Sequence, residues 1–359
     1  MKKLICLILS VLMLASCFVA CKDEPTETQT TAPETTATPT TAAPTTTTAP
    51  STTPSEPTPV DTLKFGMGVY TNVSKASDAT EDKAGEGKVA ITVAVLTVNE
   101  AGRVVACQLD TIENTVKYTA DGEAIANTAF KTKYELGYDY MMKAYGAPKE
   151  WFEQADAFEG VVVGKTLNEI KALVAEGNKG TADVMAAGCT IMINEFVVAI
   201  EKAFANLADS TATADSVLKL AMSVEQSTKD AEEDKAGTNQ VDTTIFSAAV
   251  DANGKVLVAD TDCVQVKFTF DIDGASTYDL TKVVSSKRQL GMAYGMVAYG
   301  PATLEWFEQA DVFETLCVGK SAAEIVALCV DNAYGTDAVK AAGCTMLVNG
   351  FAKAAAKLG

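Results

Sequence analysis

The sequence predicts an α+β fold built twice: two homologous repeats, each an antiparallel sheet with a β-hairpin at its centre and helices on one face. Three observations support this prediction. The block Glu-Trp-Phe-Glu-Gln-Ala-Asp-x-Phe-Glu occurs at residues 150–159 and again at 305–314. Val-Gly-Lys and Ala-Ala-Gly-Cys-Thr blocks recur downstream of it at the same spacing, which indicates a duplicated domain. In each copy, segments with strand-like alternation precede segments with helical periodicity, the order typical of α+β folds.

The composition is that of a globular protein that does not bind nucleic acid. The 359 residues suffice for about two domains of roughly 150 residues each, and 48% of them are hydrophobic. The formal net charge of −18 argues against nucleic acid, because phosphate binding depends on clustered Lys and Arg. The chain contains no histidine, which excludes Ser-His and Cys-His nucleophile pairs and every histidine-ligated metal site.

Residues 1–20 have the features of a lipoprotein signal peptide. Two lysines precede the apolar run Leu4–Leu14, which is too short to span a bilayer. Leu-Ala-Ser before Cys17 resembles a bacterial lipobox, in which the cysteine is diacylated; Cys21 is the alternative lipidation site. We therefore expect an exported protein, anchored in the lipid bilayer at the outer face of the cytoplasmic membrane or the cell surface. An ordinary cleaved signal with incidental cysteines is the other interpretation.

A linker rich in Thr and Pro is expected at residues 21–60. Its composition offers too little apolar surface to offset the entropy of ordering the chain, so we expect it to be disordered. At about 3.1 Å per residue in an extended polyproline conformation, it would span on the order of 100 Å. That length suits a tether through a cell wall.

The first repeat, residues 61–208, is expected to begin with strands. From Val89 to Val98, Val and Ile alternate with smaller or polar residues, which predicts a half-buried strand. A turn at 99–102 leads into a second strand, Arg103–Asp110. Further strands are expected at Lys64–Asn72 and Val116–Thr119. The second repeat, residues 209–359, is expected to copy these strands at Lys219–Gln226, Val241–Val250, Lys255–Asp260 and Val266–Phe270.

The Trp-containing blocks predict an amphipathic helix in each repeat. Trp151 and Phe158 fall on one helical face in the first, as do Trp306 and Phe313 in the second. We expect these faces to pack into the core.

Shorter helices are expected to follow the Trp helices. Ser/Thr-x-x-Glu capping boxes at 166–169 and 321–324 each open a short helix. The last helices are expected at Asn194–Leu207 and Asn349–Leu358. Residues 208–215 are expected to form a polar joint between the repeats.

Segments of small residues, 180–190 and 335–345, lie just ahead of the last helix of each repeat. Small residues let a ligand approach backbone N–H groups, and the start of a helix favours an anion such as phosphate. A tight turn that packs the helix on the sheet is the structural alternative.

This layout resembles the FMN-binding domain, a family found in tandem in lipoproteins of extracellular electron transfer and in flavoprotein subunits of ion-pumping oxidoreductases. There, a segment of the form Asp-x-x-Ser/Thr-Gly-Ala-Thr contacts the flavin phosphate. Ala-Gly-Cys-Thr stands in this place in both copies, without an Asp in register. The chain also resembles tandem-repeat bacterial surface lipoproteins with the same blocks. The first resemblance implies FMN as the cofactor, bound at Gly188, Cys189, Thr190, Gly343, Cys344 and Thr345.

Other notable side chains have a structural interpretation beside the functional one. The tryptophans and nearby tyrosines are either core residues or the lining of a flavin or sugar site; they are Trp151, Trp306, Tyr140, Tyr145, Tyr294 and Tyr299. The acids of the Trp blocks are either a solvated helix face or carboxylates for acid–base chemistry; they are Glu150, Glu153, Asp156 and Glu159, with Glu305, Glu308, Asp311 and Glu314. The six cysteines beyond the signal contain no Cys-x-x-Cys pair and are expected to be free thiols. No catalytic residue and no metal site is assigned.

The expected function is that of a membrane-anchored extracytoplasmic lipoprotein with two FMN-binding-like modules that relay electrons outside the cell. Binding or electron transfer is favoured over catalysis. Its expected partners are the lipid bilayer and a small ligand, not nucleic acid. Two alternatives stay open: a surface adhesin or scaffold whose repeats bind no cofactor, and a solute-binding lipoprotein.

Overall fold

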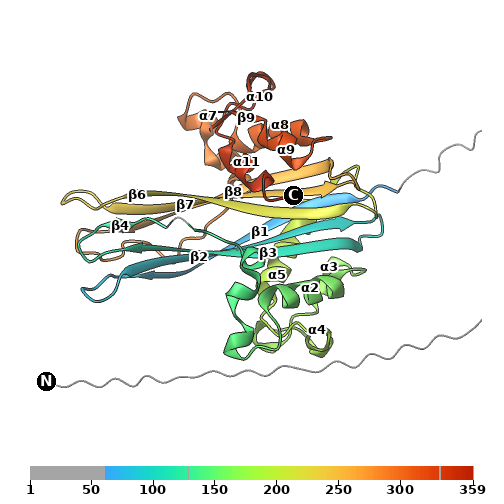
Figure 1. Ribbon diagram of the computed structural model, residues 1–359, viewed down its shortest axis with the longest axis horizontal. Coiled ribbons are helices and arrows are strands. Elements are labelled where there is room, and N and C mark those ends of the chain that lie inside the picture. Colours follow the sequence, from blue (N-terminus) through green and yellow to red (C-terminus); the bar gives the residue numbers. More distant parts are fainter. Residues whose placement is uncertain (1–60, 128, 331–332, 359) are drawn as a thin grey trace, which may run out of the picture. The chain divides into compact units, whose positions relative to one another are not determined.

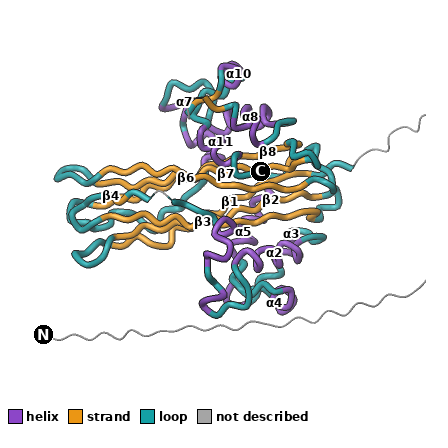
Figure 2. Tube along the Cα trace, in the orientation of Figure 1, coloured by secondary structure: helices purple, strands orange, loops and turns teal. Residues whose placement is uncertain are grey.

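The computed structural model describes residues 61–127, 129–330 and 333–358. The predicted signal peptide and linker, residues 1–60, lie outside this part of the chain. These described residues belong to one compact unit. In it, two antiparallel sheets lie face to face and helices cover the outer face of each (Figure 1 and Figure 2). The predicted α+β class is therefore confirmed.

The first sheet consists of three long strands and two short edge strands. Strands β1 (Lys64–Ser77), β2 (Gly85–Val98) and β3 (Val104–Tyr118) form an antiparallel meander. Strand β4 (Ala124–Ile125) pairs with the end of β3, and β5 (Ala208–Asp209) pairs with the start of β1. The segment expected to be a joint between the repeats therefore begins as an edge strand of the first sheet.

The second sheet is a meander of the same kind. It consists of β6 (Val217–Lys229), β7 (Gly237–Val250) and β8 (Val256–Phe270), in that order. A separate two-stranded sheet pairs β9 (Cys329–Val330) with β10 (Tyr334–Gly335).

Strands β3 and β8 are longer than the sequence predicts. The predicted strands at 103–110 and 116–119 are parts of the single strand β3, and β8 likewise joins its two predicted segments. The polar residues in between do not interrupt β3 because the buried ones have hydrogen-bond partners, Thr111 with Thr92 on β2 and Asn114 in the second sheet. The Asn114 Nδ2 donates a hydrogen bond of 2.8 Å to Thr243 Oγ1 on β7, and both side chains are buried. A buried polar group with such a partner is compatible with a strand.

The helices of the first half lie between β4 and β5 in the chain. They are α1 (Lys133–Leu136), the 3-10 helices η1 (Gly137–Tyr140) and η2 (Lys143–Tyr145), α2 (Trp151–Val162), α3 (Leu167–Lys171), η3 (Glu176–Asn178), α4 (Ala182–Ala187) and α5 (Asn194–Ala205).

The second half has a matching series. Its helices are α6 (Lys287–Leu290), η4 (Gly291–Tyr294), α7 (Met296–Tyr299), α8 (Trp306–Cys317), α9 (Ala322–Val326), α10 (Asp337–Ala341) and α11 (Asn349–Ala355). Both predicted capping boxes are present, Thr166 with Glu169 and Ser321 with Glu324.

Both faces of the sheets are buried over residues 91–98 of β2 and 243–250 of β7, because there each sheet lies between helices and the other sheet. On β2, Ile91 and Val93 face the second sheet, where they share a core with Ile245 of β7. The intervening Ala94 and Leu96 pack against the helices of the first half. The strand predicted at 89–98 is present, but the prediction that only one of its faces is buried is wrong. The second face of the strand is covered by the helices of the first half.

Helix α5 lies directly on β1, and glycine makes this approach possible. A Cβ added at Gly68 would lie only 2.0 Å from the Ala199 carbonyl oxygen and 2.3 Å from the Ala203 nitrogen. The backbones of strand and helix can come so close only where the strand residue has no side chain.

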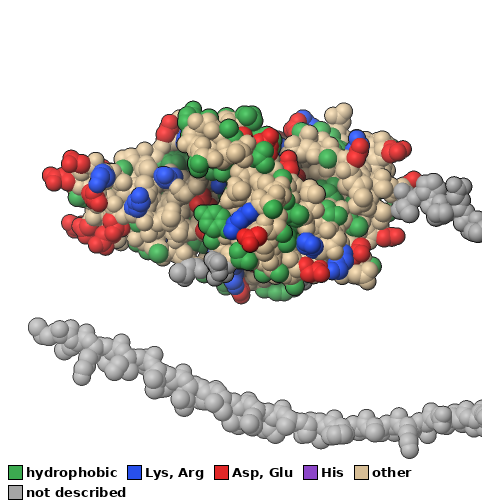
Figure 3. Space-filling model, turned by 90° about the horizontal axis from the view of Figure 1, so that it is seen from above, with side chains coloured by type: hydrophobic (Ala, Val, Ile, Leu, Met, Phe, Trp, Pro, Cys, Tyr) green, Lys and Arg blue, Asp and Glu red, His purple; other side chains and the backbone are tan. Residues whose placement is uncertain are grey.

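Acidic side chains gather at the hairpin ends of the sheets, as Figure 3 shows in red. Exposed acids there include Glu81 and Asp82 beyond β1, and Glu232, Glu233 and Asp234 beyond β6. A large net negative charge of this kind favours solubility.

Candidate ligand-binding cavity

The predicted cofactor-binding segments are engaged by glutamines from the Trp helices. In the first half, the Thr190 N–H and hydroxyl both donate to Gln154 Oε1, at 2.8 and 2.9 Å. In the second half, the N–H groups of Thr345 and Met346 donate to Gln309 Oε1, at 2.8 and 2.9 Å. Gln154 and Gln309 are both buried. In each segment, a glutamine from α2 or α8 therefore occupies the backbone N–H group of the Thr.

The other predicted cofactor-binding residues are the Gly and Cys that precede each Thr, and they form a turn next to the glutamine. Cys189 and Cys344 are fully buried. Gly188 and Gly343 have left-handed φ angles of 108° and 115°, which only glycine adopts easily. Helices α4 and α10 form within these segments, ahead of the two glycine turns.

The two segments differ in their neighbours. The Lys149 ammonium lies against Gly188, since a Cβ added there would be 2.2 Å from its Nζ. At Gly343 the nearest such neighbour is the Leu304 side chain. Only the first half therefore places a cation beside the predicted phosphate position.

The tryptophans are core residues. Trp151 and Trp306 are 4% and 5% exposed and pack edge-on against Phe196 and Phe351, with ring centroids 5.7 and 5.9 Å apart. The upstream tyrosines behave differently: Tyr145 and Tyr299 are 86% and 91% exposed. Core placement is thus correct for the tryptophans and wrong for these two tyrosines, which lie in short helices outside the layer that contacts the sheet.

Two of the repeated acids are not part of a solvated helix face. Glu150 and Glu305 are almost fully buried N-caps of α2 and α8. The Glu150 carboxylate accepts hydrogen bonds from the backbone N–H groups of Met142 and Lys143. These carboxylates join the preceding loop to the Trp helix.

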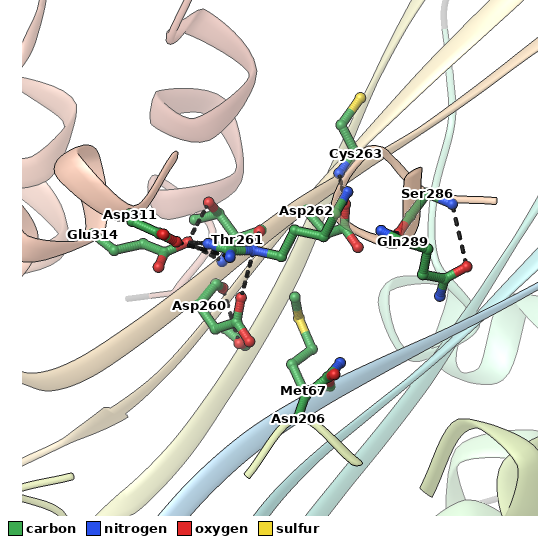
Figure 4. Close-up of polar contacts among 12 residues, drawn as sticks. Met67, Asn206, Asp260, Thr261, Asp262, Cys263, Ser286, Gln289, Asp311 and Glu314 are labelled. Carbon is green, nitrogen blue, oxygen red and sulfur yellow. Dashed lines mark hydrogen bonds and ion pairs between the residues drawn. The ribbon is translucent and has the colours of Figure 1, made fainter. Parts of the chain in front are cut away.

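A cavity of about 580 Å³ lies where the first sheet meets the second half. Apolar side chains from β1 and α8 form part of its lining: Phe65, Met67, Val69 and Phe307. Its charged lining comes from β8, α6 and α8: Asp260, Asp262, Arg288, Asp311 and Glu314. Figure 4 shows Met67 extending from β1 toward Asp260. The second Trp block supplied Asp311 and Glu314 as candidate carboxylates, but the sequence did not indicate the rest of this site, because β1 and β8 are far apart in the chain.

Arg288 organises the charged side of the cavity. Its Nε donates to the Thr261 carbonyl at 2.7 Å, and its Nη1 pairs with Asp311 Oδ1 at 2.8 Å. Its Nη2 donates to Glu314 Oε1. One guanidinium thus holds several carboxyl groups together.

Three carboxyl groups compete for that guanidinium, Asp260 being the third, 3.1 Å from Nε. Burial raises the pKa of Asp260 to about 7 and that of Glu314 to about 8, and the nearby Arg288 offsets this only in part. Burial opposes the charge on Arg288, but the carboxylates of Glu314, Asp260 and Asp311 outweigh it and raise the pKa of the guanidinium. The group as a whole therefore holds protons that isolated carboxylates would lose.

The first half carries aromatic rings at the positions of Arg288 and Met292. Tyr134 occupies the second position of α1, as Arg288 does in α6, and Tyr138 the second position of η1, as Met292 does in η4. Both tyrosines pack against Phe152, at centroid distances of 6.3 and 5.3 Å. Tyr138 and Met292 are 68% and 67% exposed, so Met292 contributes to the solvent-facing edge of the cavity.

No protein-family model, curated protein or solved structure matches this chain. The site must therefore be interpreted from its own geometry.

The thiols do not form a reactive centre in the described part of the chain. All six cysteines there are free, and burial raises the pKa of Cys189 and of Cys344 to about 11. A raised pKa keeps a thiol protonated and unreactive.

Among the described residues, no helix has the length and hydropathy needed to cross a bilayer.

Proposed function

We propose that this chain is an exported, membrane-anchored binding protein and that its small ligand occupies the cavity between β1, β8 and α8. The cavity itself carries the proposal. Its volume of about 580 Å³ falls within the range of roughly 300–1,000 Å³ typical of small-molecule sites. Apolar walls with a few convergent polar groups are the usual composition of such sites.

Binding rather than catalysis fits the arrangement of the polar groups. All three nitrogens of the Arg288 guanidinium already have partners in Thr261, Asp311 and Glu314, so this group is held as part of the cavity wall rather than being free to activate a substrate. The proposed anchor is an acylated Cys17, or Cys21, at the end of the Thr/Pro-rich linker. It would hold the folded unit outside the membrane.

The test is to express the whole chain with its export signal, purify it, and identify co-purifying small molecules by native mass spectrometry. Met292→Tyr, which introduces the residue of the first half, places a ring at the edge of the cavity and is expected to obstruct it and to reduce the bound species. Tyr138→Met is the matched control and should leave binding unchanged. Absence of any bound species, together with equal thermal shifts for wild type and Met292→Tyr across a ligand library, would contradict the proposal.

FMN binding by the first half is the second candidate, favoured by the Lys149 ammonium beside Gly188. The flavin would supply the redox chemistry of an extracellular electron relay, and Lys149 would pair with its phosphate. Binding would also require Gln154 to release the Thr190 N–H. When the protein is added to FMN, the flavin fluorescence should be quenched by the wild type and by the second-half control Leu304→Ala, but not by Lys149→Leu. If FMN does not bind and the cavity is also empty, a scaffold whose repeats bind no cofactor is the remaining candidate.

A further inference from the structure

We propose that the cavity selects an organic cation, a ligand with a protonated amine or guanidinium group attached to a short apolar skeleton. This inference rests on the proposed binding function and specifies the chemical class of the ligand. Three features of the cavity support it: the balance of charge in its lining, an acceptor atom without a donor, and the apolar walls.

The lining has more carboxyl groups than cations. Four carboxyl side chains and one guanidinium line the cavity. Asp262 on β8 is held by the backbone N–H groups of Cys263 and Arg288 rather than by a cation. Lys202 of α5 is within electrostatic range of Asp262 but is not part of the lining. A cation would favour the ionised form of these carboxyl groups and pair with it, whereas an anionic ligand would find a single guanidinium whose three nitrogens already have partners.

One carboxylate oxygen in the lining lacks a hydrogen-bond donor. The Asp260 Oδ1 is 3.1 Å from Arg288 Nε, but the single hydrogen of that Nε points to the Thr261 carbonyl. Within the described part of the chain, no other donor reaches this buried oxygen. A buried acceptor without a donor is unfavourable. An N–H group of a ligand would satisfy it.

The walls favour a carbon skeleton over a small hydrated ion. Phe65 and Met67 approach from β1, Val258 from β8, and Phe307 from α8. Apolar surface of this kind is stabilised by contact with another apolar group. The raised pKa values of Asp260 and Glu314 lead to a further expectation: a bound cation lowers them, so that binding at neutral pH releases protons.

The experiment compares three probes of similar shape and different charge: phenethylamine, 2-phenylethanol and 3-phenylpropionate. Each is titrated by calorimetry into the purified full-length chain at neutral pH, in two buffers of different ionisation enthalpy. The amine is expected to bind at least about tenfold more tightly than the other two, as expected when a charged hydrogen-bonding pair is formed in a partly buried site. The difference between the buffers should show proton release.

Two variants of the lining and one control test whether amine binding depends on the carboxyl groups of the cavity. Asp260→Asn and Asp311→Asn should each weaken amine binding by about fivefold or more, because each removes a negative charge from the lining. Asp311 is the safer variant for folding, since its side chain is 55% exposed. Asp183→Asn makes the same charge change on an exposed residue of α4 and should have no effect.

The outcomes separate this inference from the proposed function. Equal or tighter binding of the alcohol or the carboxylate, blocked by Met292→Tyr, would overturn the cation inference and leave the cavity as a ligand site. Amine binding that is unchanged in both Asp260→Asn and Asp311→Asn would also overturn it. If none of the three probes binds, the inference and the proposed site are both rejected.

Discussion

Two glutamates at matching positions differ in their cationic neighbours. Glu159 on α2 accepts a hydrogen bond of 2.7 Å from the Leu109 N–H, and Glu314 on α8 accepts one of 2.7 Å from the Thr261 N–H. Glu314 also pairs with Arg288, whereas Tyr134 stands at the Arg288 position in the first half. Burial raises the pKa of each glutamate to about 8.

These raised pKa values predict a stability that falls as the pH rises. A carboxyl group whose pKa is higher in the folded than in the unfolded chain keeps its proton on folding. Its contribution is fully present below the unfolded pKa of about 4.3 and is lost as the pH approaches the folded value of about 8. We expect Glu159→Gln to weaken this pH dependence and to raise the melting temperature near pH 8.5, because glutamine keeps the acceptor for Leu109 without a charge.

Glu314→Gln is the matched comparison. It removes a partner of Arg288, so it should be less stable than Glu159→Gln near pH 8.5. Thermal unfolding of the three proteins near pH 5.5 and pH 8.5 measures both effects. A Glu159→Gln protein that loses as much stability as the wild type between these pH values would show that Glu159 does not hold a proton in the fold.

At the scale of elements, the contact between β1 and α5 depends on a strand glycine. Gly68→Ala would place a Cβ 2.0 Å from the Ala199 carbonyl oxygen, so the helix must move away from the sheet. We expect the free energy of unfolding to fall by about 2–4 kcal/mol, as for other overpacked cores. Urea denaturation monitored by circular dichroism measures it.

Gly160→Ala is the control for that substitution. A Cβ added there meets no atom within 4 Å, and Gly160 lies inside α2. This change should stabilise the protein by up to about 1 kcal/mol, because alanine favours the helix. A Gly68→Ala protein as stable as the wild type would mean that α5 does not lie so close to β1.

At the scale of the whole molecule, the two halves share one core. Side chains of β1, β2 and β3 pack against those of β6, β7 and β8, and the Gln289 side chain of α6 donates to the Val69 carbonyl on β1 at 2.7 Å. Either half alone would expose this apolar face to water, which is unfavourable in proportion to its area. The halves are therefore expected to depend on one another for folding.

Separate expression of residues 61–208 and 209–359 tests this dependence. Each fragment alone should aggregate or unfold without cooperativity, and the two together should form a 1:1 complex. Light scattering after size-exclusion chromatography gives the masses, and calorimetry gives the cooperativity of unfolding. A monomeric 61–208 fragment with a cooperative transition of its own would instead show an independent domain.

Local patterns in the sequence were sufficient for several of the elements and for part of the core. The period of the Trp blocks predicted α2 and α8 with buried tryptophans, and the Ser/Thr-x-x-Glu boxes predicted where α3 and α9 begin. These features depend on residues a few positions apart, whose spacing is visible in the chain. The small-residue segments were also visible, but not the buried Gln154 and Gln309 that engage them from another helix.

From the residues alone, the fold class, several helices and strands, and the acidic, histidine-free chemistry of the chain could be predicted. The face-to-face packing of the two sheets and the cavity beside Arg288 became apparent only in the folded chain, because both depend on contacts between distant segments. Met67 and Asp260 line this cavity together because one sheet covers the other, and no local periodicity records which distant strands will meet.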